Sequence, residues 1–276
     1  MYPSFTMNWI LRIGAIVVVL AGAIKVRPKE VFAEEGLRQP KTSQGNHPGE
    51  KCGSGQPNVP GGVWAASSGS SSSPEEQLAT AVRALAKALK DPDPGVRESA
   101  VYGLRSMGLA AKEAIPSLGE AVRDQDGYVR AIAGRTLARF GQAAVPTLVP
   151  LLEDQRPEVR LVAAEALRTM GREAKEAVDA LARALRDPSP AVRETAVHAL
   201  REIGPDAQPA LPALQLAAAD RDGYVRSAAA RAMVRIGPAA LPALAELLHH
   251  PDQRVRRLAA EAMQTIGVET TDARLK

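Results

Sequence analysis

The stretch DPDPGVRESAVYGLRSMG at residues 91–108 decides the fold class of this chain, because it is repeated. A closely matching stretch, DPSPAVRETAVHALREIG, occupies residues 187–204. The stretch DQDGYVRAIAGRTLARFG at 124–141 likewise returns as DRDGYVRSAAARAMVRIG at 220–237. Both pairs are offset by 96 residues. Internal repetition at a fixed period is the signature of a repeat architecture and has to be resolved before any other fold argument.

The repeat unit is 30 to 33 residues long. A Val-Arg dipeptide with alanine four residues and glycine twelve residues after the valine occurs in six copies, at intervals of 33, 30, 33, 33 and 30 residues. Copies one to three match copies four to six, which indicates that a block of three units was duplicated in tandem. The six Val-Arg dipeptides lie at 96–97, 129–130, 159–160, 192–193, 225–226 and 255–256.

Each Val-Arg marks an amphipathic helix. If the valine is position 0, position 4 is always alanine, position 8 is leucine or methionine, and position 11 is apolar. These positions form one stripe of an α-helix, and the small alanine permits close packing of a neighbouring helix. Position 12 is always glycine, which we expect to end the helix in the left-handed conformation. These glycines are Gly108, Gly141, Gly171, Gly204, Gly237 and Gly267.

A second amphipathic segment precedes each Val-Arg helix and often carries proline near its start, where a missing N–H is tolerated. These prolines are Pro116, Pro146, Pro212 and Pro242. One such helical pair cannot bury its apolar stripe alone, but stacked pairs can. Only four of the nine aromatic residues lie beyond residue 74, which favours close-packed helices over a sheet. The prediction is an all-α fold: an α-solenoid of six helical hairpins over 75–267, followed by a tail at 268–276.

The repeat pattern D-x-x-P-x-V-R-x-x-A-x-x-A-L-x-x-I-G, with A-x-P-x-L in the preceding helix, resembles the HEAT repeat. More narrowly it is similar to the short HEAT-like repeats of the phycobilisome lyase type. The resemblance covers 75–267. It implies a solenoid whose second helices line a concave surface, and a scaffold that binds other proteins.

The N-terminal 1–35 are interpreted as a signal sequence or membrane anchor. Residues 10–24 are apolar except for Arg12, but the uninterrupted part, 13–24, is shorter than the roughly 17–25 residues of a membrane crossing. Its length and the motif Ala21-Gly22-Ala23 are typical of a signal peptide. We therefore expect an exported or membrane-anchored protein with an extracytoplasmic solenoid. The basic residues that follow favour the alternative, an anchor at 10–24 that leaves the solenoid in the cytoplasm; they are Lys25, Arg27 and Lys29.

Residues 36–74 are rich in Gly, Ser and Pro and are expected to form a flexible, disordered linker. The basic pI near 9.3 comes mainly from residues 1–74. Residues 1–74 carry seven Lys and Arg against four Asp and Glu, whereas 75–276 carry 28 against 27. The repeat segment is almost neutral, which makes nucleic acid an unlikely partner. The single cysteine, Cys52, permits no intramolecular disulfide.

Two sets of polar residues in the repeats are candidates for function. The arginine of each Val-Arg has an aspartate six residues before it in five copies, with His250 in the sixth. Aspartates cap turns and arginines hold carboxylates, so we expect a structural ladder between units rather than an anion-binding site. His249 and His250 are expected to be turn residues that replace the aspartate.

Positions 2, 6 and 9 after the valine form the opposite stripe, which varies between copies and holds six Arg and four Glu. We predict that this stripe, with the tyrosines of the two DGYVR copies, binds an unknown protein or peptide; a merely solvated face is the alternative. The predicted partner-binding residues are Tyr102, Arg105, Tyr128, Arg135, Arg168, His198, Arg201, Tyr224 and Arg231.

Enzymatic activity is not expected. Deoxyhypusine hydroxylase, which the chain resembles in architecture, binds two irons through His-Glu pairs directly after Val-Arg, and His-Glu occurs nowhere in this sequence. Bilin lyases, the other similar enzymes, need a groove for a tetrapyrrole that no motif here marks. We predict a non-catalytic scaffold without cofactor or metal. The alternatives are an enzyme or enzyme subunit related to those families, and a weak nucleic-acid binder.

Overall fold

The computed structural model describes residues 73–274, and the side chains of 73–267. The apolar segment 10–24 and residues 36–72 of the predicted linker lie outside this range, so the signal or anchor, the tether and the localisation stay predictions. The last linker residue, Pro74, is the first residue of helix α2 (Pro74–Ala88). Within 73–274, no helix combines the length and apolar character that crossing a bilayer requires.

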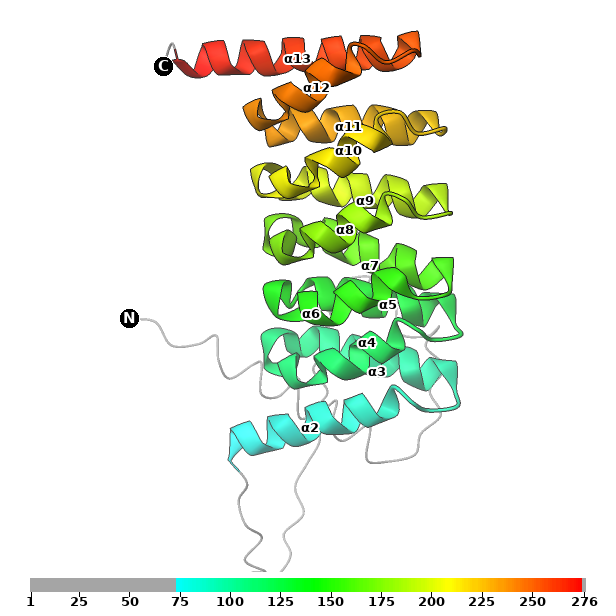
Figure 1. Ribbon diagram of the computed structural model, residues 1–276. Helices are drawn as coiled ribbons and strands as arrows, with labels where there is room; N and C mark the ends of the chain where they lie inside the picture. The colour runs from blue at the N-terminus through cyan, green and yellow to red at the C-terminus, as the bar shows by residue number, and fades with distance from the viewer. Residues whose placement is uncertain (1–72, 275–276) are drawn as a thin grey trace, which may run out of the picture. The chain divides into compact units, whose positions relative to one another are not determined.

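Residues 73–274 form six helical pairs stacked one upon another, and no strand (Figure 1). This confirms the predicted all-α solenoid. We number the pairs as units 1 to 6. The first helices are α2 (Pro74–Ala88), α4 (Ile115–Ala121), α6 (Val145–Leu148, continued by the 3₁₀ segment η4, Val149–Glu153), α8 (Val178–Ala184), α10 (Leu211–Ala217) and α12 (Leu241–Leu247). The second helices are α3 (Pro94–Met107), α5 (Gly127–Ala138), α7 (Pro157–Met170), α9 (Pro190–Ile203), α11 (Gly223–Ile236) and α13 (Gln253–Arg274).

The second helices begin and end for local reasons. The side chains of Asp93, Asp126 and Asp222 accept hydrogen bonds from backbone N–H groups of the first turn of α3, α5 and α11. Proline at the first helical position starts α3, α7 and α9. Five of the predicted cap glycines have positive φ, between 56° and 92°. Gly108, Gly171, Gly204 and Gly237 directly follow their helices, whereas Arg139 and Phe140 separate Gly141 from the end of α5 at Ala138.

The prediction for the sixth glycine is wrong. Gly267 lies inside α13, which continues to Arg274. In units 1 to 5 the chain has to turn after the glycine because a further apolar helix packs back onto the stack. Residues 268–276 contain no such apolar segment, so nothing pulls the chain out of the helix, and the expected tail is helical to Arg274.

The connectors between units explain why the repeat has two lengths. Each is a 3₁₀ segment in which buried alanines recur every third residue, as a helix of three residues per turn requires. In the 33-residue units it reads Gly-x-x-Ala-x-x-Ala, and in the 30-residue units Gly-x-x-Ala. One turn of 3₁₀ helix is therefore the difference. The long connectors are η2 (Gly108–Ala114), η5 (Gly171–Ala177) and η6 (Gly204–Ala210); the short ones are η3 (Gly141–Ala144) and η7 (Pro238–Ala240).

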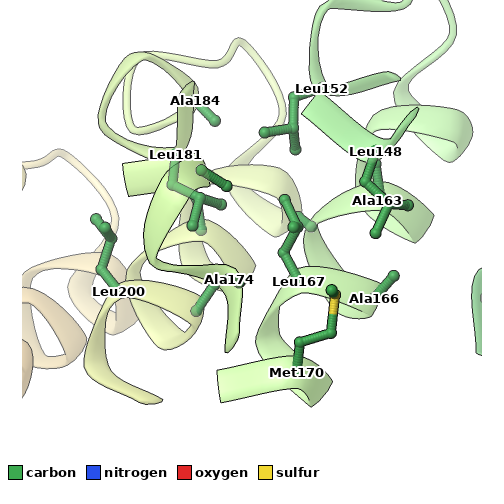
Figure 2. Close-up of a cluster of buried hydrophobic side chains, with 14 of the residues drawn as sticks. Leu148, Leu152, Ala163, Ala166, Leu167, Met170, Ala174, Leu181, Ala184 and Leu200 are labelled. Carbon is green, nitrogen blue, oxygen red and sulfur yellow. The ribbon is translucent and has the colours of Figure 1, made fainter. Parts of the chain in front are cut away.

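The core lies between the two helical layers and consists of aliphatic residues and alanine. Figure 2 shows Leu148 and Leu152 of unit 3 facing Ala163 and Leu167 of α7, with Leu181 of α8 alongside. The predicted stripe is buried in α7, where Ala163 and Leu167 are fully inaccessible. Second helices also approach each other closely: a Cβ at Gly134 of α5 would collide with Val162 of α7.

Ion pairs between successive units confirm the predicted ladder at three junctions. The guanidinium group of Arg97 forms a bidentate ion pair with the carboxylate of Asp124 in the next unit. Its Nε donates to Oδ2 at 2.7 Å, and its Nη2 donates to Oδ1 at 2.8 Å. The same carboxylate accepts a hydrogen bond from the N–H of Asp126, and Nη1 of Arg97 donates to the carbonyl oxygen of Asp91. The equivalent bidentate pairs are Arg160–Asp187 and Arg193–Asp220.

The ladder is interrupted at the two short connectors, where the prediction is wrong. Arg130 and Arg226 keep the bond from Nη1 to a carbonyl oxygen, but neither has a carboxylate partner within 73–274. The missing 3₁₀ turn alters the placement of the next turn, so Asp154 binds Arg123 instead, at 2.8 Å. The duplicate carries neither member of that pair: Ala219 and His250 stand at the equivalent positions.

His250 replaces the aspartate as a turn residue, as predicted. Its Nδ1 accepts a hydrogen bond from the N–H of Asp252, and its carbonyl oxygen accepts one from Nη1 of Arg256. The imidazole therefore keeps the turn, although it supplies no carboxylate for Arg226.

Removing a ladder carboxylate should cost stability well beyond that of an ordinary surface change. Asp220→Ala leaves the guanidinium of Arg193, whose side chain is only 5% exposed, without its fork partner. We expect a loss of about 2–4 kcal/mol in the free energy of unfolding. Asp206→Ala, which removes an exposed carboxylate on η6, should stay within about 0.5 kcal/mol. Urea denaturation compares the two; equal losses would contradict the ladder's role.

The ladder also predicts loss of stability in acid. Burial by itself raises the pKa of Asp124 and Asp220, but hydrogen bonds from Arg97 or Arg193 and from a backbone N–H outweigh it, so both pKa values lie below the ordinary value. The stabilisation is therefore present above the unfolded pKa of about 3.9 and is lost as pH falls through the lower folded values. Urea midpoints at neutral and acidic pH should show a smaller drop for Asp124→Asn with Asp220→Asn than for the unchanged chain. The same drop in both would exclude these carboxylates as the cause.

Candidate functional site

The second helices present a continuous surface of variable residues. We call the surface formed by positions 2, 6 and 9 of α3, α5, α7, α9, α11 and α13 the second-helix face. Each of these positions is exposed or half-buried, and none is part of the core. The sequence therefore identified the orientation of this stripe correctly. Seven predicted residues lie on it, namely Tyr102, Arg105, Arg135, Arg168, His198, Arg201 and Arg231, and the other two, Tyr128 and Tyr224, lie in the first turns of α5 and α11.

Four of these arginines come from four consecutive, mutually packed helices. Arg135 lies on α5, Arg168 on α7, Arg201 on α9 and Arg231 on α11; we call them the arginine row. Packed helix axes lie about 8–10 Å apart. Arg168 and Arg201 occupy the same position, position 9, on neighbouring helices, whereas Arg135 and Arg231 occupy position 6, about one helical turn earlier. Arg201 donates to Glu202 at 2.7 Å. The other three make no side-chain hydrogen bond or ion pair to any residue that the structure describes.

The first-helix layer treats its charges differently. There, Arg123 binds Asp154, Arg183 binds Glu153 at 3.0 Å, and Gln215 binds Glu246 at 2.7 Å, each bond joining two units. Across the second-helix face in the described part of the chain, a single side-chain hydrogen bond joins two units, and it is between tyrosines. The guanidinium groups of the row are thus not consumed by holding the stack together.

A hollow lies between α5 and α7. Arg135 stands on one side of it and Arg168 on the other, with Glu165 beside them. Its floor is formed by small or short side chains: Ala131, Gly134, Val162, Ala166 and Thr169. The close approach of the two helices at Gly134 makes the hollow shallow and polar, suited to a side-chain tip rather than to an enclosed small molecule.

A second hollow lies where α7, α9 and α11 end. It is lined by Arg172, Glu202 and Arg235 together with Ile203, Gly204 and Pro205. None of its three charged residues was predicted from the sequence, because the predicted stripe ends at position 9 after the valine. Glu202 and Arg235 occupy position 10 and Arg172 position 13, so extending the same count by one helical turn would have found them.

His198 lies half-buried at the centre of the second-helix face. Its pKa lies below the ordinary value, because of burial first and the charge of Arg201 next; Arg168 and Arg231 act in the same direction. The opposing carboxylate is Glu194, whose Oε1 is 3.7 Å from Nε2. The imidazole is therefore neutral near pH 7. Its pKa depends on the positive charges of Arg168, Arg201 and Arg231, which are three members of the row.

The tyrosines of the two DGYVR copies have different surroundings. The hydroxyl of Tyr128 is 2.6 Å from that of Tyr102, and this hydrogen bond raises the pKa of Tyr128. In the duplicate, His198 takes the position of Tyr102, and Tyr224 makes no side-chain hydrogen bond within 73–274. Tyr224 is 75% exposed, against 52% for Tyr128. The first copy thus links units 1 and 2, whereas the second leaves its ring in solvent.

No group of three or more His, Cys, Asp or Glu side chains suited to a metal ion occurs in the described part of the chain. The arginines at position 1 are engaged in the structure, whereas most polar groups of the second-helix face are not engaged within 73–274. The groups of this face can form charge-assisted hydrogen bonds and aromatic contacts.

Comparison with protein families gives one result that spans the repeats. The family model of HEAT repeats matches residues 71–138, 115–175, 145–234 and 210–276. The comparison with curated proteins gives no match.

Solved structures similar to this chain include natural and engineered proteins. An engineered protein is 25% identical, with 68% of this chain and 96% of that one covered and a TM-score of 0.46. The complex of CpcE and CpcF of phycocyanin lyase from Nostoc sp. PCC7120 is 25% identical, with 55% and 98% covered and a TM-score of 0.44. Human deoxyhypusine hydroxylase in complex with glycerol is 22% identical, with 69% and 97% covered and a TM-score of 0.39.

The exposure of the two tyrosines predicts that neither is needed for folding. Changing Tyr128 and Tyr224 together to alanine should lower the melting temperature by no more than about 2–4 °C, because one exposed hydrogen bond is lost and no core contact. Leu167→Ala, which empties a fully buried position, should cost about 2–5 kcal/mol and serves as the comparison. If thermal unfolding shows that the tyrosine variant loses as much melting temperature as Leu167→Ala, the rings belong to the core.

Proposed function

The chain belongs to the HEAT repeat family, and we propose that it is a non-catalytic scaffold that binds a protein or peptide on the second-helix face. The observation that carries this proposal is the arginine row: one guanidinium group per helix, none of them bonded to another unit, and three of the four, those of Arg135, Arg168 and Arg231, without a side-chain partner among the described residues. An arginine fork free of internal partners is a donor for carboxylates and for planar polar groups of another molecule.

The division between a constant frame and a variable face supports the same function. At position 4 all six units have alanine, whereas at position 6 they have Tyr102, Arg135, Glu165, His198, Arg231 and Glu261. Uniform packing positions give every unit the same geometry, and the different side chains give each unit a different contact. Such a surface suits an elongated partner that touches several units at once.

The ladder supports the proposal from the energetic side. Because the forks of Arg160 and Arg193 fix the relative placement of units 3, 4 and 5, three of the four members of the row are held in position before any partner arrives. Pre-organised donors lose little conformational entropy on binding, and this raises the affinity that a given set of contacts can supply.

Capture of partners from cell extract by the tagged full chain tests the function. In the test variant Arg135, Arg168 and Arg201 become glutamate; in the control variant Lys87, Lys175 and Arg186, exposed residues away from the second-helix face, become glutamate. Both changes alter the net charge equally, and circular dichroism checks that both variants remain helical. We expect the test variant to lose the partners that the control retains. Retention of every partner by the test variant would exclude the second-helix face as the binding surface.

A further inference from the structure

We propose that the second-helix face binds an extended, acidic polypeptide segment whose carboxylates recur at every third residue and lie along the arginine row. This proposal rests on the scaffold function above and specifies the chemistry and shape of its partner. It is carried by the charge of the face, the step of the row and the aromatic pair at one end of it.

Positive charge is concentrated on this face although the repeat segment as a whole is almost neutral. Positions 2, 6 and 9 of the six units carry six arginines and four glutamates. This is an excess of two positive charges, whereas the whole of 75–276 has an excess of one, 28 against 27. The remainder of that segment is therefore net negative, and an acidic ligand is directed to the second-helix face.

The arrangement of these charges favours separate carboxylates over a continuous line of phosphates. Glu165 lies beside the hollow between Arg135 and Arg168, and Glu194 lies next to His198. A nucleic-acid backbone would bring phosphates against these glutamates, because like charges in contact are unfavourable. A polypeptide with neutral residues between its acidic ones can place each carboxylate at an arginine. Its neutral residues then lie against Glu165 and Glu194 of the second-helix face, so that no like charges meet.

The step of the row matches one backbone conformation. Arg168 and Arg201, the central pair of the row, occupy equivalent positions on helices about 8–10 Å apart, and Arg135 and Arg231 flank them about one helical turn earlier on their own helices. A polyproline II segment has three residues per turn and rises about 3.1 Å per residue, so every third side chain points the same way at about 9.3 Å. In a β-strand, side chains on one side recur at about 6.8 Å or twice that value, which fits the row less well.

The aromatic pair fits a segment of that conformation. Tyr102 and Tyr128 lie at the unit 1 end of the face, with 40% and 52% of their surface exposed, and their mutual hydrogen bond fixes the rings. Exposed aromatic rings are the usual receptors for proline in polyproline II ligands. An acidic segment that also contains proline would therefore contact the tyrosines at one end and the arginines along the rest.

The experiment measures binding of synthetic peptides to the full chain. The probe is a fluorescent peptide of five Glu-Pro-Pro repeats; comparison peptides have Lys in place of Glu, or the same composition with all glutamates in one block. We expect the Glu-Pro-Pro peptide to bind, the lysine peptide not to bind, and the blocked peptide to bind at least about five-fold more weakly. Raising salt from about 50 to 300 mM should weaken the binding because exposed charges are screened.

Variants locate the site. Arg168→Glu with Arg201→Glu should weaken binding of the Glu-Pro-Pro peptide at least about ten-fold, while Lys87→Glu with Arg186→Glu should change it less than about two-fold. His198 supplies an independent readout on the unchanged protein: carboxylates placed against Arg168, Arg201 and Arg231 offset their charge, so the pKa of His198 followed by NMR should rise when the peptide binds.

Three results would overturn the proposal: no binding of the Glu-Pro-Pro peptide, equal binding of the blocked peptide, or tighter binding of a single-stranded oligonucleotide of equal charge. They are distinguishable from failure of the scaffold function. In one outcome, cellular partners are captured by the unchanged chain and lost when Arg135, Arg168 and Arg201 become glutamate, while the Glu-Pro-Pro peptide does not bind. That result supports the scaffold function and contradicts the proposed acidic segment with a carboxylate at every third residue. If no partner depends on the row, the scaffold function fails as well.

Discussion

The hydrogen bonds and ion pairs of the turn aspartate, which is present in units 1 to 5, are the interactions on which the solenoid depends. In unit 2 the carboxylate of Asp124 accepts from the N–H of Asp126 and so shapes the turn, and it accepts the fork of Arg97 and so fixes the preceding unit. Its carbonyl oxygen accepts from Nη1 of Arg130, which ties the turn to its own second helix. One residue thus stabilises the turn, links the turn to the second helix of its own unit, and links that unit to the preceding one. Because its bonds are made to both sides, the placement of one unit determines the placement of the next.

Most of the fold could be predicted because its determinants are local and repeated six times. The stripe of positions 0, 4, 8 and 11 gives the core side of the second helices, with Val96 of α3 as an exception at 39% exposed. The glycine at position 12 gives the end of the helical count in units 1 to 5. The same count gives the exposed side, and the structure places every one of those residues in solvent or half-buried. Repetition matters here, since an alanine or glycine that is ambiguous in one helix becomes a rule when it recurs in phase.

What the sequence did not give depends on contacts between units. The pairing of Arg123 with Asp154, in place of Arg130, follows from the length of the connector, a property of two units together. The contact between Tyr102 and Tyr128 joins side chains 26 residues apart that no periodic count aligns. Gly267 shows the opposite limit: its local signal is the same as in the other five units, but its conformation is decided by the absence of a packing helix directly after it. The charged residues Arg172, Glu202 and Arg235 were within reach of the same count and were missed because the count ended too early.

The short connectors also bear on how the stack carries mechanical load. At the junctions between units 1 and 2, 3 and 4, and 4 and 5, a nearly buried guanidinium–carboxylate fork resists sliding. Between units 5 and 6 the described side chains offer the bond from Gln215 to Glu246 and apolar packing, but no fork. The stiffness of the stack is therefore uneven along its axis. A ligand lying across α9, α11 and α13 would therefore brace a junction that has no guanidinium–carboxylate pair of its own among the described residues.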